Sequence, residues 1–276
     1  MDATQTTAFA DELIRLSDTA ALAEPITSRT PGFSIDDAYA VSSEVLRRRE
    51  SSGWKRVGRK IGFTNRTIWD QYSVYQPIFG YMYEATVREA SESDGGLAGT
   101  IELAPLAQPL IEPEIVFRLR SAPPVTDDPV LLLRCIEWYG HGFEVVQCHF
   151  PDWKFQVADT IADGGLHGRY LVGPRVAVEA GKEQALADEL ASFRITLSKD
   201  GEVAAEGGGT LVLDSPLNAL AHLVKLLDTL PDHPKLEAGE LVTTGTLTKA
   251  LPVAPGQTWS TRFDGLGLPC LTVRFS

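Results

Sequence analysis

The run IEPEIVF contains two glutamates, Glu112 and Glu114, separated by one proline. On a β-strand, residues two apart share a face, so both carboxylates would leave one side of the strand close together. Burying two such anions is costly unless a cation offsets their charge. Pro113 cannot donate to a sheet ladder, which predicts a sheet edge or a bulge at this point. Taken alone, this spacing is more typical of a strand face exposed to solvent.

A third carboxylate, Glu144, lies in the apolar run GFEVVQ, where an isolated charge is out of place. Three carboxylates with open positions for water form the hard oxygen ligand set that Mg²⁺ or Mn²⁺ prefers. We therefore expect Glu112, Glu114 and Glu144 to bind a divalent metal ion. The histidines are scattered and more typical of surface or capping residues than of ligands: His141, His149, His167, His222 and His233.

Lys60 opens the run KIGFTN, directly after the cationic loop SSGWKRVGR. By itself it is typical of an exposed charge. Beside a metal-bound anion, it would neutralise a substrate carboxylate or transfer protons, with Gly62 allowing close approach. A lysine that acts as acid and base needs its pKa lowered by burial or nearby cations, whereas the glutamates would raise it. A Schiff base on Lys60 is the rival mechanism, disfavoured because the carboxylates already supply an electrophile through the metal.

Helical spacing predicts helices near the N-terminus and again over residues 65–72, and Ser34 with Asp37 forms a capping pattern. Short strands with many glycines and prolines follow, including a strand over 111–119 and a hairpin turning at Asp200-Gly201. Thr126 is expected to cap a helix that runs through VLLLRCIEW. The helices do not alternate regularly with the strands, which favours an α+β roll or sandwich over a doubly wound sheet.

Composition describes an ordinary globular chain of 276 residues, with 43% hydrophobic residues and a formal net charge of −12. This charge argues against nucleic acid as a partner but permits small anionic substrates beside a local cation. The N-terminal residues do not resemble a secretory signal, and no apolar run reaches membrane-spanning length. Cys135, Cys148 and Cys270 lack zinc-site spacing, so we expect reduced thiols and a cytoplasmic protein without membrane contact.

Several motifs occur in order between Arg59 and Phe275: GRKIGFTN, QPIFGYM, IEPEIVF, FEVVQ, DWKFQVADTIADGGLHGRYLVG, GGGTLVLDSPLNALAHLV and TTGTLTKALPVAPGQTW. Their order and spacing resemble the fumarylacetoacetate hydrolase superfamily, in particular its branch of 2-keto-4-pentenoate hydratases and 4-oxalocrotonate decarboxylases. The resemblance implies a mixed β-sheet roll over residues 81–276, preceded by a helical region over residues 1–80. It also implies homo-oligomers around divalent metal sites, with Mg²⁺ or Mn²⁺ as cofactor.

Carried over by position, the resemblance places the metal ligands at the same three glutamates and the catalytic, substrate-binding lysine at Lys60. The glycine-hydroxyl turn of the family falls on Gly245 and Thr246, which implies substrate contact there. Asp159 matches an aspartate that supports the site and is expected among the substrate-binding residues, and His167 could supply a further polar group to the substrate.

The function implied is a metal-dependent hydro-lyase acting on a short, anionic 2-oxo or 2-hydroxydienoic acid in the catabolism of aromatic or related compounds. Alternatives are a decarboxylase of a 2-oxo dicarboxylate, a C–C bond hydrolase, or a non-catalytic subunit in complex with a paralogous hydratase or decarboxylase. Two departures bear on this choice. Ile78 replaces an aspartate usual in the hydratases, and Gly164-Gly165 replaces polar residues of their A-D-N-A-S run. An apolar wall at Ile78 would favour decarboxylation, because it disfavours water.

Overall fold

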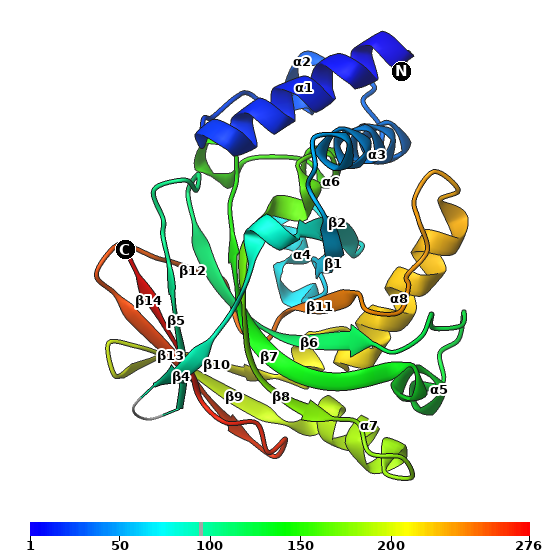
Figure 1. Cartoon of the computed structure of the whole chain (residues 1–276). Coiled ribbons are helices and arrows are strands. Elements are labelled where there is room, and N and C mark those ends of the chain that lie inside the picture. The colour runs from blue at the N-terminus through cyan, green and yellow to red at the C-terminus, as the bar shows by residue number, and fades with distance from the viewer. Residues whose placement is uncertain (94–95) are drawn as a thin grey trace.

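The computed structural model describes residues 1–93 and 96–276, which form a helical layer above two curled β-sheets (Figure 1). The α-helices are α1 (Ala3–Thr19), α2 (Ile26–Arg29), α3 (Ile35–Ser51), α4 (Trp69–Tyr72), α5 (Pro129–Arg134), α6 (Val157–Ala162), α7 (Glu183–Ser192) and α8 (Pro216–Thr229). The strands are β1 (Arg56–Gly62), β2 (Ile78–Tyr83), β3 (Val87–Glu89), β4 (Ser91–Ser93), β5 (Gly96–Ile101), β6 (Leu110–Leu119), β7 (Ile136–Val146), β8 (His167–Ala177), β9 (Arg194–Lys199), β10 (Glu202–Gly208), β11 (Leu241–Thr246), β12 (Leu251–Pro252), β13 (Thr258–Asp264) and β14 (Leu271–Phe275).

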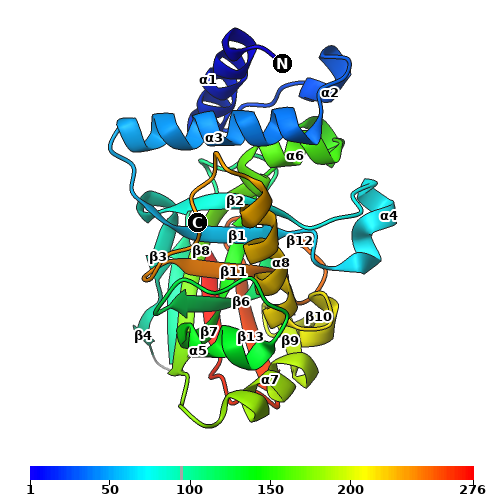
Figure 2. The same cartoon turned by 90° about the vertical axis from the view of Figure 1, so that its right-hand side faces the viewer.

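The two long N-terminal helices begin at side-chain caps that their sequences encode. Ser34 accepts a hydrogen bond from the backbone of Asp37, whose carboxylate in turn accepts one from the Ser34 backbone. Asp2 and Gln5 form the same reciprocal cap on α1. Helix α3 crosses the end of the sheet above α6, and α1 packs on α3 (Figure 2). This layer therefore covers the end of the sheet next to α6. Helix α6 in turn leads into the site described below.

The larger sheet has the order β2-β1-β11-β6-β7-β8-β3, with β12 paired to β6, and so places the sequence-distant strands β1, β11, β6 and β7 side by side. Strand β1 runs parallel to β11, with Lys60 opposite Thr243. Strands β6 and β7 are antiparallel, with Glu112 opposite Glu144. Strand β11 lies between β1 and β6, and its pairing with β6 is irregular between Thr243 and Thr246. The register thus brings one lysine and three glutamates into one region of the sheet.

The smaller sheet, in the order β10-β9-β13-β14-β5-β4, packs against the larger one. Apolar side chains from both sheets fill the space between them, among them Phe143, Leu171, Trp259 and Val273. A second core forms where α8 and the N-terminal helices cover the larger sheet, with Leu220 and Leu223 fully buried. Burial of this kind stabilises by about 25 cal/mol per Å² of apolar surface, so the two cores stabilise the packing of the sheets around the site.

The α+β class with a helical N-terminal region is confirmed, as are the strand over 111–119 and the Asp200-Gly201 hairpin. Both turn residues of this hairpin have positive φ, at 51° and 87°. Pro113 lies inside the sheet, opposite Phe143 of β7, so the expected edge is not observed. The irregular pairing lies instead on β11 between Thr243 and Thr246, and Leu247 just beyond it donates to the Pro113 carbonyl at 2.8 Å. The division expected at residue 80 falls within β2, and whether 1–80 and 81–276 behave as separate units stays a prediction.

The helix expected from Thr126 through Trp138 is wrong at both ends. Asp128 caps α5, and the Thr126 hydroxyl instead accepts from the Asp128 backbone. The helix ends at Arg134 because residues 136–146 pair with β6 and β8 along their length. Sheet pairing outweighs the local helical pattern here. Among the described helices, none combines the length and apolarity needed to cross a membrane.

A candidate metal centre and its cavities

Three glutamates converge on one face of the larger sheet. Glu112 and Glu114 leave β6 on the same side, and Glu144 projects from the facing position of β7. One carboxylate oxygen from each lies within 4.8 Å of the others. Glu114 and Glu144 are fully buried and Glu112 is partly exposed. The strand face predicted to be either a metal site or solvent-exposed is therefore buried.

The burial of three carboxylates together makes each of them hard to ionise. Burial is the largest cause for all three; neighbouring glutamates add to it for Glu112 and Glu114, and Lys60 opposes it at each of the three. The pKa of Glu112 rises to about 8, that of Glu114 rises well above its ordinary value, and that of Glu144 is also raised. Like charges at these distances need a cation to be ionised together at neutral pH.

The contacts of the carboxylate oxygens test whether a cation fits. The backbone N–H of Gly245 donates to Glu114 Oε2 at 3.0 Å, and Glu144 Oε1 contacts His167 Nδ1 at 2.8 Å. Among the described residues, Glu114 Oε1 is buried without a hydrogen-bond partner, and Glu144 Oε2 is buried with only the ammonium group of Lys60 near it, at 3.2 Å. Buried acceptors of this kind are costly unless they bind something. Each buried glutamate thus has one oxygen fixed by the protein and one left for a divalent cation, whose hard oxygen ligands these are.

Lys60 lies against these carboxylates and is buried, with 2% of its surface exposed. Its Nζ is 3.2 Å from Glu144 Oε2 and donates a hydrogen bond of 2.9 Å to the carbonyl of Gly165. Burial opposes the charge of Lys60, but Glu144, Glu112 and Glu114 outweigh it and raise the pKa of the ammonium group. Lys60 is therefore an inward-facing cation, and in the absence of a metal it is protonated at neutral pH.

A cavity of about 270 Å³ opens beside the glutamates. Lys60, Glu112 and Thr246 of the predicted site residues line it, together with Lys249 and the Gly165 backbone. Most of the remaining wall is aromatic or aliphatic: Phe63, Ile68, Tyr72, Leu110, Val146, Trp153, Phe155 and Leu166. Tyr72 and Phe155 stack with ring centroids 5.4 Å apart. Its size is close to the lower end of small-molecule pockets, about 300 Å³.

The two residues of the turn predicted to contact substrate, Gly245 and Thr246, have different roles. Gly245 has φ of +95°, and a side chain there would collide with the Thr64 hydroxyl, so glycine is required. Its N–H points at Glu114 rather than into the cavity. Thr246 does line the cavity, while its hydroxyl donates to the carbonyl of Thr248 at 3.1 Å. The turn therefore holds Glu114 in place through the Gly245 N–H and contributes Thr246 to the cavity wall.

The structure does not bring Asp159 into the cavity. Asp159 is fully buried in the first turn of α6, where its carboxylate accepts hydrogen bonds from the backbone and hydroxyl of Thr27 at 2.9 and 2.6 Å. It also accepts from the Gln156 backbone at 2.8 Å. These contacts tie α2 to α6, so its expected contact with substrate gains no support from this geometry.

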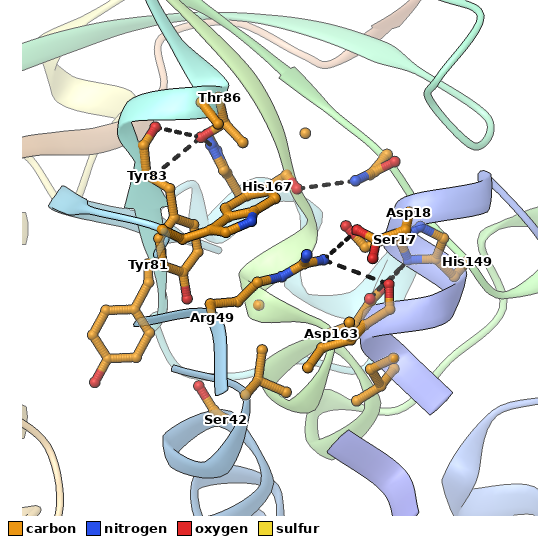
Figure 3. Close-up of a pocket in the computed structure, with 18 of the residues that line it drawn as sticks. Ser17, Asp18, Ser42, Arg49, Tyr81, Tyr83, Thr86, His149, Asp163 and His167 are labelled. Atoms are coloured by element: carbon orange, nitrogen blue, oxygen red, sulfur yellow. Dashed lines mark hydrogen bonds and ion pairs between the residues drawn. The ribbon is translucent and has the colours of Figure 1, made fainter. Parts of the chain in front are cut away.

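His167 contacts Glu144 and does not line the 270 Å³ cavity. Its Nδ1 faces Glu144 Oε1 at 2.8 Å and its Nε2 faces the Thr86 hydroxyl at 2.9 Å. Burial, reinforced by the charges of Lys60 and Arg169, lowers the pKa of His167 to about 3, so the ring is neutral. Beside an ionised Glu144, the ring donates from Nδ1 and accepts the Thr86 proton at Nε2. On its other side it borders a second cavity (Figure 3).

The structure also shows where the two departures from the hydratase pattern lie. Ile78 is fully buried in the apolar core and does not line the 270 Å³ cavity, so the argument for an apolar wall at the reacting carbon loses its basis. Gly165 has φ of +67° and supplies the carbonyl that holds Lys60. Sequence reasoning treated this glycine only as a loss of polar groups, although a positive φ could have been suspected from the Gly-Gly pair.

Sequence reasoning also missed Tyr170, which lies opposite Glu144 on β8. It is buried, its hydroxyl has no hydrogen-bond partner in the described chain, and burial together with Glu114 and Glu144 raises its pKa well above 10.0. No motif marked it, because an aromatic residue in a strand is typical of any core.

Comparison with known proteins adds to this geometry. The profile of the family described as fumarylacetoacetate (FAA) hydrolase C-terminal matches residues 88–274. A 2-hydroxyhexa-2,4-dienoate hydratase of Comamonas testosteroni is 33% identical over 246 residues, 88% of either protein. A 4-oxalocrotonate decarboxylase of Pseudomonas putida is 31% identical over 245 residues, which cover 88% of this chain and 86% of the relative.

Among solved structures, 4-oxalocrotonate decarboxylase from Pseudomonas putida G7, complexed with magnesium and adipate, is similar with a TM-score of 0.88. The two chains are 26% identical, and the alignment covers 100% of this chain and 99% of the other. The similarity therefore includes the helical N-terminal layer as well as the sheets.

Proposed function

The chain belongs to the fumarylacetoacetate hydrolase family, and from this premise we propose a divalent-metal-dependent lyase acting on a short 2-oxo or 2-hydroxydienoic acid. The main activity is hydration of the 2-keto-4-pentenoate type, in the breakdown of aromatic or related compounds. One observation carries the proposal: three carboxylates within 4.8 Å of one another lie beside a buried lysine at a small cavity.

Glu112, Glu114 and Glu144 are the residues that would hold Mg²⁺ or Mn²⁺. The unpartnered Glu114 Oε1, the Glu144 Oε2 that faces only the Lys60 cation, and the raised pKa values of the cluster support this assignment. A bound divalent ion supplies a Lewis acid that stabilises the enolate of a 2-oxo acid. Gly245 orients Glu114 through its backbone N–H, and His167 orients Glu144 through Nδ1.

Lys60 serves as the proton donor and as the charge partner of the substrate carboxylate. The Gly165 carbonyl and Glu144 hold its ammonium group at the wall of the cavity. In this position the protonated group can donate a proton to the substrate. In hydration, proton transfer converts the dienol to an α,β-unsaturated ketone, and water then adds at the distal carbon. Donation by Lys60 to the carbon chain fits a raised pKa better than abstraction does.

The cavity wall supports a substrate with a short hydrocarbon chain. Phe63, Tyr72, Trp153 and Phe155 surround the space beyond Lys60 and provide apolar surface. Thr246 lines the same cavity and would contact the substrate there. A site of this kind excludes bulk water and strengthens the interaction of Lys60 with the substrate.

Decarboxylation of a 2-oxo dicarboxylate is the second candidate. It is favoured by the similarity of the whole chain to a solved 4-oxalocrotonate decarboxylase. Lys249, a second cation at the cavity, could pair with the distal carboxylate of such a substrate. A product assay separates the candidates: incorporation of water into 2-hydroxypenta-2,4-dienoate without CO₂ supports hydration, whereas CO₂ released from 4-oxalocrotonate supports decarboxylation.

Metal dependence is tested by removing and restoring the ion. Treatment with EDTA should abolish turnover of the dienoate, and Mg²⁺ or Mn²⁺ should restore it. Full turnover after exhaustive chelation would contradict the metal-dependent mechanism. Ordinary turnover by the purified chain alone would also exclude the alternative of a non-catalytic subunit.

We also propose a homo-oligomer, able to associate with a paralogous hydratase or decarboxylase, in the cytoplasm. Family membership supports the assembly, and three free cysteines, Cys135, Cys148 and Cys270, fit a reducing compartment. Size-exclusion chromatography with light scattering measures the assembly: a purely monomeric mass over a wide concentration range would contradict it.

A further inference from the structure

A second cavity, of about 490 Å³, lies between the N-terminal helices and the larger sheet (Figure 3). It is larger than the cavity at the metal centre and has a different lining. His167 and the Gly164-Gly165 turn separate the two, with Gly164 facing the second cavity and Gly165 the first. Its volume lies within the range of about 300–1,000 Å³ found for small-molecule sites.

Arg49 is the main polar group of this second cavity. Figure 3 shows it extending from α3 between Tyr83 and Asp163. Only 7% of its surface is exposed, and its guanidinium group lies 4.1 Å from the ring centroid of Trp54. Nη2 donates to Asp18 at 2.7 Å and to the Ile14 carbonyl at 3.5 Å. Within the described chain, no group accepts a hydrogen bond from Nε or Nη1, so this nearly buried arginine retains donors for a ligand.

The charges that line the cavity leave it positive. Asp18 pairs with Arg49, and Asp163 pairs with His149 at 2.7 Å. Arg169 also lines the cavity, and its Nη1 donates only to a backbone carbonyl, that of Gly168, at 2.8 Å. Although burial opposes it, Asp163 raises the pKa of His149. With His149 protonated, both carboxylates are paired, and the remaining charge is that of the Arg169 guanidinium. A cationic lining of this kind favours an anion.

The rest of the lining is apolar. Side chains from α1, α3, the loop between α3 and β1, and β2 contribute to it: Leu13, Ile14, Val45, Trp54, Tyr81 and Tyr83. A ligand complementary to both the cationic and the apolar part of the lining needs a carboxylate and a compact apolar or aromatic body. A simple inorganic anion would leave the apolar surface uncovered, and a hydrocarbon would leave the N–H groups of Arg49 unsatisfied.

We propose that this second cavity, lined by Arg49, Arg169 and Trp54, is a binding site for a small aromatic or branched apolar carboxylate, separate from the metal centre. The proposal does not rest on the enzymatic activity of the chain. It is tested with metal-free protein, in which a carboxylate cannot be chelated at the three glutamates.

The experiment is isothermal titration of the full chain with benzoate, with benzamide as a neutral analogue and acetate as one without the apolar body. We expect one saturable benzoate site, with both analogues bound at least about tenfold more weakly. Arg49→Met should weaken benzoate binding by about ten- to a hundredfold, because it removes a charged donor. Arg47→Met is the matched control: Arg47 lies on the same helix, is largely exposed and pairs with Glu44 outside the cavity, so binding should be unchanged.

A second variant guards against a folding defect in Arg49→Met. Ala85 is exposed and lines the same cavity, so Ala85→Trp should occlude it without removing a charge. Loss of benzoate binding in Ala85→Trp, with thermal unfolding unchanged, supports the site. Equal affinity for benzamide, or benzoate binding unaffected by Ala85→Trp, overturns it. Binding lost in Lys60→Met but retained in Ala85→Trp would place benzoate at the metal centre and also overturns it.

Discussion

At the scale of the residue, Lys60 depends on its neighbours for both its charge and its position. The three glutamates keep it protonated despite burial, and the Gly165 carbonyl fixes Nζ. A lysine that is already charged is suited to donate a proton or to neutralise an anion, and poorly suited to act as a base or to form a Schiff base.

Replacement of Lys60 tests this role. Lys60→Met should lower kcat for dienoate hydration by about 10²–10⁴-fold, the range for loss of a general acid. Mn²⁺ affinity should be retained or increased, because a positive charge is removed from beside the carboxylates. Lys55→Met, at an exposed lysine on the preceding loop, is the control and should leave both values unchanged. Full activity in Lys60→Met would refute the assignment.

The contact of His167 with Glu144 is the basis on which we propose that it orients a metal ligand. We expect His167→Phe, which keeps an aromatic ring and removes the hydrogen bond, to weaken Mn²⁺ binding by about 10–100-fold, as for other residues that orient metal ligands. Titration of Mn²⁺ by electron paramagnetic resonance measures this without relying on activity. His222→Phe, on α8 outside both cavities, provides the comparison. Unchanged Mn²⁺ affinity in His167→Phe would mean that Glu144 is oriented without it.

At the scale of the element, the site depends on strand register. The spacing of Glu112 and Glu114 was enough to predict a shared face, and the expected position of β6 was confirmed. The pairing of Glu112 with Glu144, and of β11 between β1 and β6, is a non-local property that one sequence does not encode in any short pattern. The same reason explains why the helix expected through Trp138 was wrong.

Asp159, expected from its motif position to support substrate binding, connects two helices in the structure. Asp159→Asn should lower the free energy of unfolding by about 1–3 kcal/mol, because buried bonds from Thr27 and Gln156 lose a charged acceptor. KM for the dienoate should change little. Urea unfolding and steady-state kinetics measure the two effects. A large rise in KM with unchanged stability would contradict this and support contact between Asp159 and the substrate.

At the scale of the whole molecule, the buried carboxylates couple stability to pH and to the metal. The pKa of Glu112 is raised from 4.5 to about 8 in the metal-free fold, and those of Glu114 and Glu144 are raised as well. Between these pH values the unfolded chain releases the Glu112 proton while the folded chain retains it. Folding is therefore disfavoured progressively as pH rises through this window.

We expect the metal-free protein to unfold at lower urea concentration as pH increases from about 4.5 to about 8, and Mn²⁺ to remove most of this dependence. Glu112→Gln, which cannot ionise, should flatten the pH dependence of the metal-free protein. Stability that increases over the same range in the wild-type chain, but not in Glu112→Gln, would contradict the pKa assignment of the cluster.

The most direct measurement of the central claim is crystallography of the protein soaked with Mn²⁺ and oxalate, with anomalous scattering recorded for manganese. We predict one strong anomalous peak within coordination distance of Glu112, Glu114 and Glu144, with oxalate on its open side towards Lys60. An active protein whose crystals show no peak at these three glutamates, or a peak at other ligands, would contradict the account.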